Sequence, residues 1–491
     1  MKIEQITLKN FRCFELLDVT FHPQMTVLIA PNGAGKTTIL DAVRIALWPF
    51  VKGFDLGSQT GKSATIQIED VRLERREQEM EPILPSQIAA QASGIIQVIS
   101  VKDNKPSPFQ WQQSRDQVKS RTQSKGDQST QLLTKSAKSY QSVIYKGQQT
   151  DPEAIDLPLV VYLGTGRLWY QGRYASEAKD QKLDTSVFSR LWGYQNCLTA
   201  TSSYKQFETW YGWVFRSYRE LQIDQLENRL KKQDQSALAN FAAAIEVVQR
   251  AINTLTTSLT GWRDLQYRSS MGQQLVMEHP ELGYMPLSLL SDGLRNMVAM
   301  VSDIAFRCIK LNPHLGVDAA HKTQGIVLID EVDMFLHPAW QQTVLASLQQ
   351  AFPKIQFIVT THSPQVLTTI DNNCIRLLRQ SEQDGVTRTA VITPQWQTKG
   401  VASADVLATI MGIDPVPNVS EAQALSRYKQ MIEMDQLSNH PDAGRLREQL
   451  LAHFGATHPL MLECERLIRL QTIKKRLPPV LQPVKGPSFD A

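Results

Sequence analysis

The sequence contains little cysteine and no long uninterrupted hydrophobic run. Its five cysteines are scattered over 491 residues without a CxxC pair, so neither a disulfide framework nor a zinc site is indicated. The longest apolar runs, at 159–163 and 326–329, are far shorter than the about 20 residues that a membrane helix requires. The first residues, MKIEQITLKNF, alternate like a strand and lack the apolar core of a secretory signal peptide. We therefore expect a cytoplasmic protein with reduced thiols and no membrane contact.

Charge of one sign is concentrated in a single segment. From 102 to 146, nine Lys and Arg residues stand against three Asp, a larger surplus than the net charge of +4 for the whole chain. The centre of this segment, QQSRDQVKSRTQSKGDQSTQ, has few large apolar side chains, so burial cannot offset the entropy lost on ordering. We predict a flexible surface insertion, either a solvated loop or an arm that contacts nucleic-acid phosphates.

A stretch of small residues, LIAPNGAGKTTILDAV, has the pattern of a phosphate-binding loop. MTVLIA predicts the strand before it and TTILDAVRIAL the helix after it, which is the context such a loop requires. Gly33 and Gly35 let backbone N–H groups approach phosphate oxygens. Lys36 reaches the β- and γ-phosphates, and Thr37 offers its hydroxyl to Mg²⁺. Ala30 stands where the motif begins with glycine, and its small side chain fits.

A second stretch, GIVLIDEVDMFLHP, predicts the other half of the same chemistry. Its apolar start is typical of a parallel strand buried on both faces, and such a strand places Asp330 and Glu331 at the carboxyl edge of the sheet. Asp330 can complete the magnesium shell. Glu331 is then placed to orient and deprotonate a water molecule for attack on the γ-phosphate. The two stretches together predict an ATPase.

Two further motifs indicate the class of ATPase. Ser291 to Gly293 precede an apolar helical pattern and resemble the LSGGQ signature of ABC-type ATPases, with Asp292 in place of its first glycine. The apolar strand IQFIVTTHSP ends at His362, where ABC-type ATPases carry a switch histidine. Taken alone, Ser291 is by default explained as a helix cap, and His362 as a structural histidine. The order of all four motifs favours the ABC class.

Within that class, the chain resembles the RecF, SMC, Rad50 and OLD branch. ITLKNFRCFE is similar to the opening strand and turn of this branch, which implies that Arg12 lies near the nucleotide. The E-x-D-x-x-L-H-P pattern after the Walker B strand is similar to that of OLD-type proteins, which implies that Asp333 and His337 lie near a dimer seam. LPLVVYLGTGRLW, SRLWGYQNCLTATSS and GVASADVLATIMGIDPVP resemble the ATPase subunit of Septu anti-phage systems, including those encoded beside retrons.

This resemblance implies an α/β fold, namely an ABC-type ATPase head with a parallel P-loop sheet, antiparallel edge strands and a helical insertion, followed by an α-helical carboxyl-terminal region. The predicted domains are an amino-terminal half of the head at 1–169, a helical insertion at 170–280, a carboxyl-terminal half at 281–416 and a tail at 417–491. Within the tail, residues to 476 have helical patterns, whereas prolines exclude helix from the last stretch. That end is either a floppy terminus or a docking peptide.

The resemblance also implies ATP and Mg²⁺ as ligands and an ATP-sandwich homodimer or higher homo-oligomer. One implied partner is a separately encoded HNH nuclease subunit, which the ATPase dimer senses and regulates. In a retron, a reverse transcriptase with its RNA/DNA hybrid is a further implied partner. The alternative is a RecF- or SMC-like DNA-repair ATPase. No nuclease motif is recognised in the chain, and no single glutamine among those at 87–150 stands out as the metal-linking one. The predicted site comprises Glu331 and His362 for catalysis, Thr37 and Asp330 for the metal, and Arg12, Asn32, Gly33, Ala34, Gly35, Lys36, Thr37, Thr38, Ser291, Gly293 and Asp333 for the nucleotide.

Overall fold

The computed structural model describes residues 1–56, 63–76, 79–94, 109–119, 124–150, 155–167, 189–199, 204–383, 386–438 and 440–476. The chain divides into two compact units, Met1–Val406 and Leu407–Ala491, called here the head and the tail unit. The division lies close to residue 417, where the sequence predicts that the tail begins. No helix within the described ranges has the length and apolar character needed to cross a membrane. All five cysteines are free thiols.

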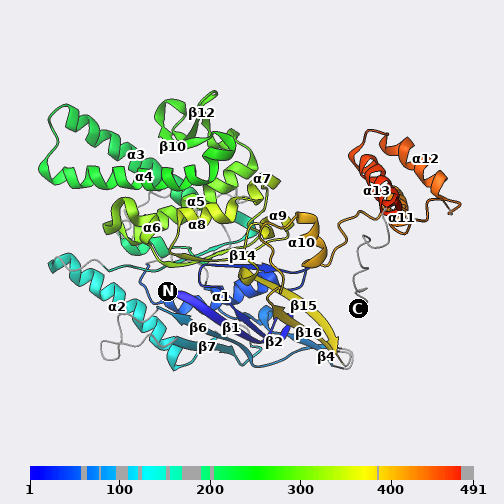
Figure 1. The fold of residues 1–491 in the computed structure, drawn as a ribbon. Helices are drawn as coiled ribbons and strands as arrows, with labels where there is room; N and C mark the ends of the chain where they lie inside the picture. The colour runs from blue at the N-terminus through cyan, green and yellow to red at the C-terminus, as the bar shows by residue number, and fades with distance from the viewer. Residues whose placement is uncertain are drawn as a thin grey trace. The chain divides into compact units, whose positions relative to one another are not determined.

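The head is built on a six-stranded sheet in the order β16-β15-β3-β14-β13-β9 (Figure 1). All neighbouring strands are parallel except β16, which runs antiparallel to β15. The four strands that hold the centre and one edge are buried at every position, as expected for near-continuous apolar runs. The predicted α/β head with an antiparallel edge strand is confirmed. The strands are β3 (Met25–Ile29), β9 (Leu159–Leu163), β13 (Gly325–Ile329), β14 (Ile355–Thr360), β15 (Ile375–Gln383) and β16 (Val386–Ile392).

A second, antiparallel sheet has the order β2-β1-β6-β7-β8, and helix α1 (Lys36–Lys52) lies between it and the six-stranded sheet (Figure 1). Every residue of α1 except three is buried, so both sheets cover it. A separate two-stranded hairpin is formed by β4 (Leu73–Arg76) and β5 (Glu79–Pro82). The strands of the antiparallel sheet are β1 (Lys2–Phe11), β2 (Phe14–Thr20), β6 (Ser86–Ser93), β7 (Phe109–Arg115) and β8 (Lys125–Gly126).

The prediction of a flexible insertion at 102–146 is wrong for most of its described residues, because these form β7, β8 and helix α2 (Gln128–Thr150). Alternate side chains of β7 point inward, and Trp111 and Gln113 donate hydrogen bonds to backbone carbonyls of α1. The Gln113 acceptor is the carbonyl of Ile45, 2.7 Å away. Pro49 lies four residues later in α1 and has no N–H to satisfy that carbonyl. Residues 102–108 and 120–123 lie outside the described ranges.

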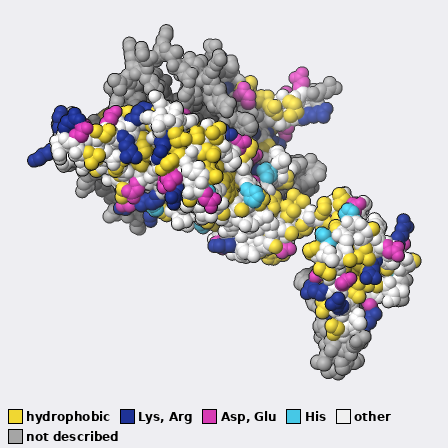
Figure 2. Space-filling view, turned by 90° about the horizontal axis from the view of Figure 1, so that it is seen from above, with side chains coloured by type: hydrophobic (Ala, Val, Ile, Leu, Met, Phe, Trp, Pro, Cys, Tyr) yellow, Lys and Arg dark blue, Asp and Glu magenta, His cyan; other side chains and the backbone are white. Residues whose placement is uncertain are grey.

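The predicted helical insertion at 170–280 contains two long helices, α3 (Tyr204–Leu226) and α4 (Lys232–Thr260), but it also contains sheet. Strands β10 (Arg263–Arg268) and β11 (Gln274–His279) lie within these bounds and form a three-stranded antiparallel sheet with β12 (Gly283–Pro286), which follows them. The prediction of helices alone is therefore incomplete. On the face formed by α3 and α4, Figure 2 shows hydrophobic side chains interspersed with charged ones. Residues 168–188 and 200–203 lie outside the described ranges.

The rest of the head consists of helices that cover the parallel sheet on the side opposite α1 (Figure 1). The long helix α5 (Asp292–Leu311) is almost entirely buried from Leu294 to Cys308. The shorter helices are α6 (Ala319–Lys322), α7 (Pro338–Gln341), α8 (Val344–Ala351) and α9 (Pro364–Leu367). Helix α10 (Ser403–Thr409) spans the division between the two units.

The tail unit is helical, as predicted. Helices α11 (Ser420–Glu433), α12 (Ala443–Phe454) and α13 (Pro459–Arg476) enclose a small core centred on Tyr428 and Ile432. The proline-rich end at 477–491 lies outside the described residues, so the choice between a floppy terminus and a docking peptide stays open.

Candidate functional site

The loop that connects β3 to α1 depends on two glycines. Gly33 and Gly35 have φ values of 78° and 98°, in the left-handed region that glycine adopts without strain. A Cβ on Gly35 would lie 2.4 Å from Cζ of Phe14 and 2.9 Å from Sγ of Cys13, whereas a Cβ on Gly33 would meet nothing within 4 Å. Gly35 is therefore required by close packing against the β1–β2 turn. At Gly33, by contrast, no neighbouring atom would contact an added side chain.

The Lys36 side chain turns back into the loop that precedes it. Its Nζ donates to the carbonyl oxygens of Ala30, at 2.8 Å, and of Pro31, at 3.2 Å. Burial lowers the pKa of Lys36, and the nearby carboxylates of Asp330 and Glu331 offset part of this effect. The amine is thus held at the loop beside the two acids of the Walker B strand. Among the other predicted loop residues, Asn32 is exposed, while Ala34 and Thr38 are buried.

Thr37 and Asp330, the predicted metal residues, are hydrogen-bonded to each other at the carboxyl edge of the parallel sheet. The Thr37 hydroxyl donates to Oδ2 of Asp330 at 3.0 Å, and Thr360 donates to Oδ1 of the same carboxylate at 2.6 Å. A hydroxyl and a single carboxylate are hard oxygen ligands of the kind that Mg²⁺ uses when substrate phosphates and water complete its shell. The described residues contain no group of three acidic, histidine or cysteine side chains that could hold a metal by themselves. This donor set fits nucleotide-bound Mg²⁺.

Glu331 adopts an unusual backbone conformation directly after the metal residue. Its φ of 48° lies in the left-handed region, which costs free energy for a residue that is not glycine. Its N–H donates to Oγ1 of Thr360 at 2.7 Å, which helps to stabilise this conformation. The side chain is half-buried, and His362, also half-buried, follows the adjacent strand β14. The parallel register of β13 and β14 thus brings Glu331 and His362 to the same edge of the sheet.

The loop after Glu331 is tied to the segment that carries His362. Oδ1 of Asp333 accepts a hydrogen bond from Thr361 at 2.6 Å, and Ser363 donates to Gln341 at 2.7 Å. The residues on both sides of His362 are therefore anchored to this loop. His337 has a local structural role, because its Nδ1 accepts from the N–H of Ala339 and caps α7.

The signature residues lie at an exposed helix start. Ser291 is the amino-terminal cap residue of α5 by position, yet its side chain makes no capping hydrogen bond, so the helix-cap explanation does not account for its hydroxyl. Gly293 is packed so tightly that a Cβ would lie 2.6 Å from the carbonyl oxygen of Phe335. Asp292 forms an ion pair with Arg295 on the same helix. Leu289, just before the signature, is 71% exposed.

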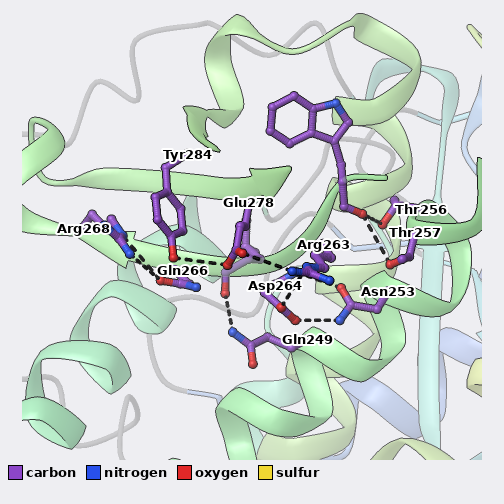
Figure 3. Close-up of polar contacts among 12 residues, drawn as sticks. Gln249, Asn253, Thr256, Thr257, Arg263, Asp264, Gln266, Arg268, Glu278 and Tyr284 are labelled. Carbon is purple, nitrogen blue, oxygen red and sulfur yellow. Dashed lines mark hydrogen bonds and ion pairs between the residues drawn. The ribbon is translucent and has the colours of Figure 1, made fainter. Parts of the chain in front are cut away.

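Polar contacts between α4 and the three-stranded sheet support the segment that leads into the signature (Figure 3). Asn253 of α4 both donates to the carboxylate of Asp264, at 2.8 Å, and accepts from its N–H, at 2.9 Å. Gln249 donates to the carbonyl of Leu265 at 3.1 Å. Across the sheet, Glu278 accepts from Arg263 and from Tyr284. Tyr284 lies in β12, the strand that precedes the signature in the chain.

Arg12 lies in the turn between β1 and β2, next to the Cys13 that packs against Gly35. Its guanidinium binds Asp41 of α1 at 2.7 Å and Asp70 at 2.8 Å. The structure therefore brings Arg12 to the underside of the phosphate-binding loop, where two carboxylates hold it.

Sequence reasoning missed two buried residues of this site, Arg167 and Asn296. Arg167 follows β9 and hydrogen-bonds to the backbone of both Walker B acids, and Asn296 links it to the signature helix. The only signal was the phrase GTGRLW, which served above as a mark of family resemblance.

The comparisons with known proteins agree with this geometry. A family model described as an AAA domain matches residues 5–259, and a second AAA-domain model matches residues 175–368. The chain is 24% identical over 468 residues to the Retron Vc95 probable ATPase of Vibrio cholerae serotype O1 biovar El Tor, covering 89% of this chain and 84% of that protein. It is 24% identical over 504 residues to the Retron Ec83 probable ATPase of Escherichia coli, with 94% and 86% covered. A Septu protein PtuA of Bacillus mycoides is 36% identical over 141 residues, which cover 28% of this chain and 18% of that protein.

The parallel sheet, the phosphate-binding loop and the paired acids define a P-loop ATPase of the ABC class. The chain belongs to the AAA-domain family, and its similarity to retron ATPases and to a Septu protein supports an ABC-class ATPase of the retron and Septu type. The predicted enzyme class and family are thus confirmed.

Proposed function

We propose that this ATPase hydrolyses ATP at composite sites in a homodimer. Lys36 and Thr37 of one protomer and Ser291 and Gly293 of the other enclose the same γ-phosphate. The observation that carries this proposal is the contrast between a phosphate-binding loop bonded within its own chain and an exposed signature serine whose hydroxyl caps nothing. ATP would then join two heads, and hydrolysis would release them.

In the proposed reaction, each residue acts from the position described above. The Lys36 amine leaves the carbonyls of Ala30 and Pro31 for the phosphate oxygens. Thr37 and Asp330 hold Mg²⁺, which when bound neutralises charge on the phosphates. Glu331 orients and deprotonates the attacking water, and His362 approaches the γ-phosphate from the adjacent strand.

The remaining predicted nucleotide residues act around this centre. Asn32, Gly33, Ala34, Gly35 and Thr38 shape the loop that contains the phosphates. Asp333 lies at the seam between protomers. Arg12 supports the loop from below through its ion pairs with Asp41 and Asp70.

The dimer is tested by measuring molecular mass in solution. The Glu331→Gln variant, which retains ATP, should double in mass with Mg²⁺ and ATP and stay monomeric with ADP. A Ser291→Arg change in that background is expected to abolish the shift without weakening ATP binding. If the Glu331→Gln variant with Ser291 intact stays monomeric with ATP bound, the composite site is contradicted.

We further propose that the ATPase acts in cytoplasmic anti-phage defence and regulates a separately encoded HNH nuclease. The similarity to retron ATPases and to a Septu protein supports the role in defence. The five free thiols support a cytoplasmic location. Where the chain is encoded in a retron, a reverse transcriptase with its RNA/DNA hybrid joins the complex.

Co-expression with the proteins encoded beside this chain tests the partnership. The full chain should co-purify with an HNH protein and leave plasmid DNA intact on its own. Deleting 477–491 tests the proline-rich end as the docking element, and deleting 417–491 tests the helices. If DNA stimulates turnover and no neighbouring protein co-purifies, the repair ATPase becomes the better account.

A further inference from the structure

Arg167 is a buried arginine whose hydrogen bonds converge on the backbone of the two Walker B acids. Its side chain donates to the carbonyl oxygens of Asp330, at 2.6 Å, and Glu331, at 2.7 Å. It also donates to the carbonyl of Gly164 at 3.2 Å and to Oδ1 of Asn296 at 2.8 Å. Only 3% of the residue is exposed to solvent. Its planar fork of donors serves four acceptors on three separate segments.

These contacts surround the strained residue of the site. Thr360 holds the N–H of Glu331, while Arg167 and the N–H of Met334 share its carbonyl. Both peptide groups that flank the Glu331 Cα are therefore anchored by hydrogen bonds. Because φ is 48° there, the loss of one anchor allows the backbone to relax toward an ordinary conformation and moves the side chain.

Asn296 connects the same arginine to the signature. It lies on α5 shortly after Ser291, is fully buried, and donates to the carbonyl of Met334 at 2.8 Å while it accepts from Arg167. A helix moves as a rigid element, so displacement of the signature is transmitted to Asn296. From Asn296 it passes to Arg167 on one side and to the loop after Glu331 on the other.

We propose that Arg167 is a positioning residue for Glu331 and that the Arg167–Asn296 bond couples the signature helix to Glu331 within one protomer. The proposal rests on the composite site described above. In such a dimer, the signature of one protomer contacts ATP on its partner, whereas its own Glu331 acts on its own ATP. Nucleotide at one site thereby controls the catalytic glutamate of the other, and the two sites hydrolyse ATP cooperatively.

The charge state of Arg167 suits this role. Burial lowers its pKa to about 10, so the guanidinium stays protonated at neutral pH and keeps all its donors. Lysine cannot replace it, because a single ammonium group has no planar fork to bridge two carbonyls and an amide.

The first test is Arg167→Lys in the full chain. We expect kcat to fall about tenfold to a hundredfold, the range for a catalytic group displaced by about 1 Å, with ATP affinity unchanged within about threefold. Arg190→Lys is the matched control, since Arg190 also donates to carbonyls, of Leu311 at 2.8 Å and Ile155 at 2.6 Å, away from the acids. Equal losses of kcat in the two variants would overturn the positioning role.

The second test is Asn296→Ala, which removes both the acceptor for Arg167 and the donor to the Met334 carbonyl. We expect kcat to stay within a few-fold of wild type, while the Hill coefficient for ATP falls from above one to one. This variant also serves if Arg167→Lys does not fold. A wild-type Hill coefficient of one, or an unchanged coefficient in Asn296→Ala, overturns the coupling.

A third variant separates failure of this inference from failure of the proposed mechanism. Adding Arg167→Lys to Glu331→Gln should cause little further loss of turnover, because the residue being positioned is already disabled. If Glu331→Gln alone leaves turnover unchanged, the proposed role of Glu331 fails. If Glu331→Gln is inactive but Arg167→Lys is fully active, only the positioning role fails.

Discussion

The two halves of the candidate site differ in how completely the chain satisfies them. Around the phosphate-binding loop, the polar groups of Lys36, Thr37 and Asp330 are all bonded within the chain. At the signature, Ser291 is exposed, caps nothing, and stands beside an exposed Leu289. The loop half is therefore preorganised by bonds within the chain, as the proposed nucleotide site requires. The signature half has exposed polar and apolar groups that no other part of the described chain covers.

The largest effect is expected in the preorganised half. Glu331→Gln should lower ATP turnover by about a hundredfold or more, because it removes the proposed base while keeping the shape of the site. ATP binding should persist, which separates catalysis from affinity. Turnover and nucleotide binding are measured together, with Glu281→Gln, an exposed acid in the β11–β12 turn, as the control. Wild-type turnover in the Glu331 variant, in a preparation free of contaminating ATPase, contradicts this role.

Mixing two inactive variants tests the comparison directly. Lys36→Ala disables the preorganised half and Ser291→Arg the exposed half, so a mixed dimer has one composite site free of both changes. With random pairing, half of the dimers are mixed and each has one intact site, so at most about a quarter of wild-type activity should return; coupling to the disabled second site lowers this fraction. Each variant alone provides the baseline. If mixed dimers form and no activity returns, each protomer hydrolyses ATP by itself.

A smaller effect is expected where the two halves touch within one protomer. Gly293→Ala places a Cβ 2.6 Å from the Phe335 carbonyl, so the loop after Glu331 must shift. Turnover should fall about tenfold with ATP still bound. Gly444→Ala is the matched control, since this helical glycine has nothing within 4 Å of an added Cβ. Equal activity of both variants would show that the contact tolerates a methyl group.

The next smallest effect is expected at Gln113 of β7, which supports helix α1 behind the phosphate-binding loop. Gln113→Ala leaves the Ile45 carbonyl without its donor and should lower the free energy of unfolding by about 1–3 kcal/mol. Gln110→Ala, an exposed position in the same strand, should change it little. Denaturant unfolding of the two variants checks the difference. Identical midpoints would show that another group takes over the bond.

The smallest effect is expected from the basic segment at 102–146. Lys119→Ala with Lys125→Ala should flatten the salt dependence of nucleic-acid binding, because each lost phosphate contact releases about one counterion fewer. Arg115→Ala is not a suitable control, since Arg115 is buried and donates to the carbonyls of Ile66 and Lys119. Lys322→Ala, an exposed lysine paired with Asp318, serves instead. An unchanged salt slope would leave the segment without a role in nucleic-acid binding.

Prediction from sequence succeeded for the features that leave a local pattern. The parallel strands and the phosphate-binding loop were predictable because burial on both faces demands continuous apolar runs, and close approach to phosphate demands glycine. Both demands act on neighbouring residues, so they leave local patterns. The paired acids at the end of β13 were found for the same reason.

Prediction from sequence failed where burial depends on distant partners. Gln113 and Arg115 look like solvent-exposed residues, yet each is only 3% exposed because carbonyls far along the chain accept their hydrogen bonds. The entropy argument for a flexible segment counted apolar burial alone and so missed this compensation.

By itself, the sequence determined the ATPase chemistry and the class, since these depend on residue types at short spacings: glycines and lysine in one loop, and two acids at one strand end. Only the tertiary structure decided that Arg167 and Asn296 belong to the site. Arg167 is more than a hundred residues from both Asn296 and Glu331 in the chain. Their bonds satisfy backbone carbonyls, which every residue type possesses, and such acceptors leave no mark in the sequence until folding brings the donor to them.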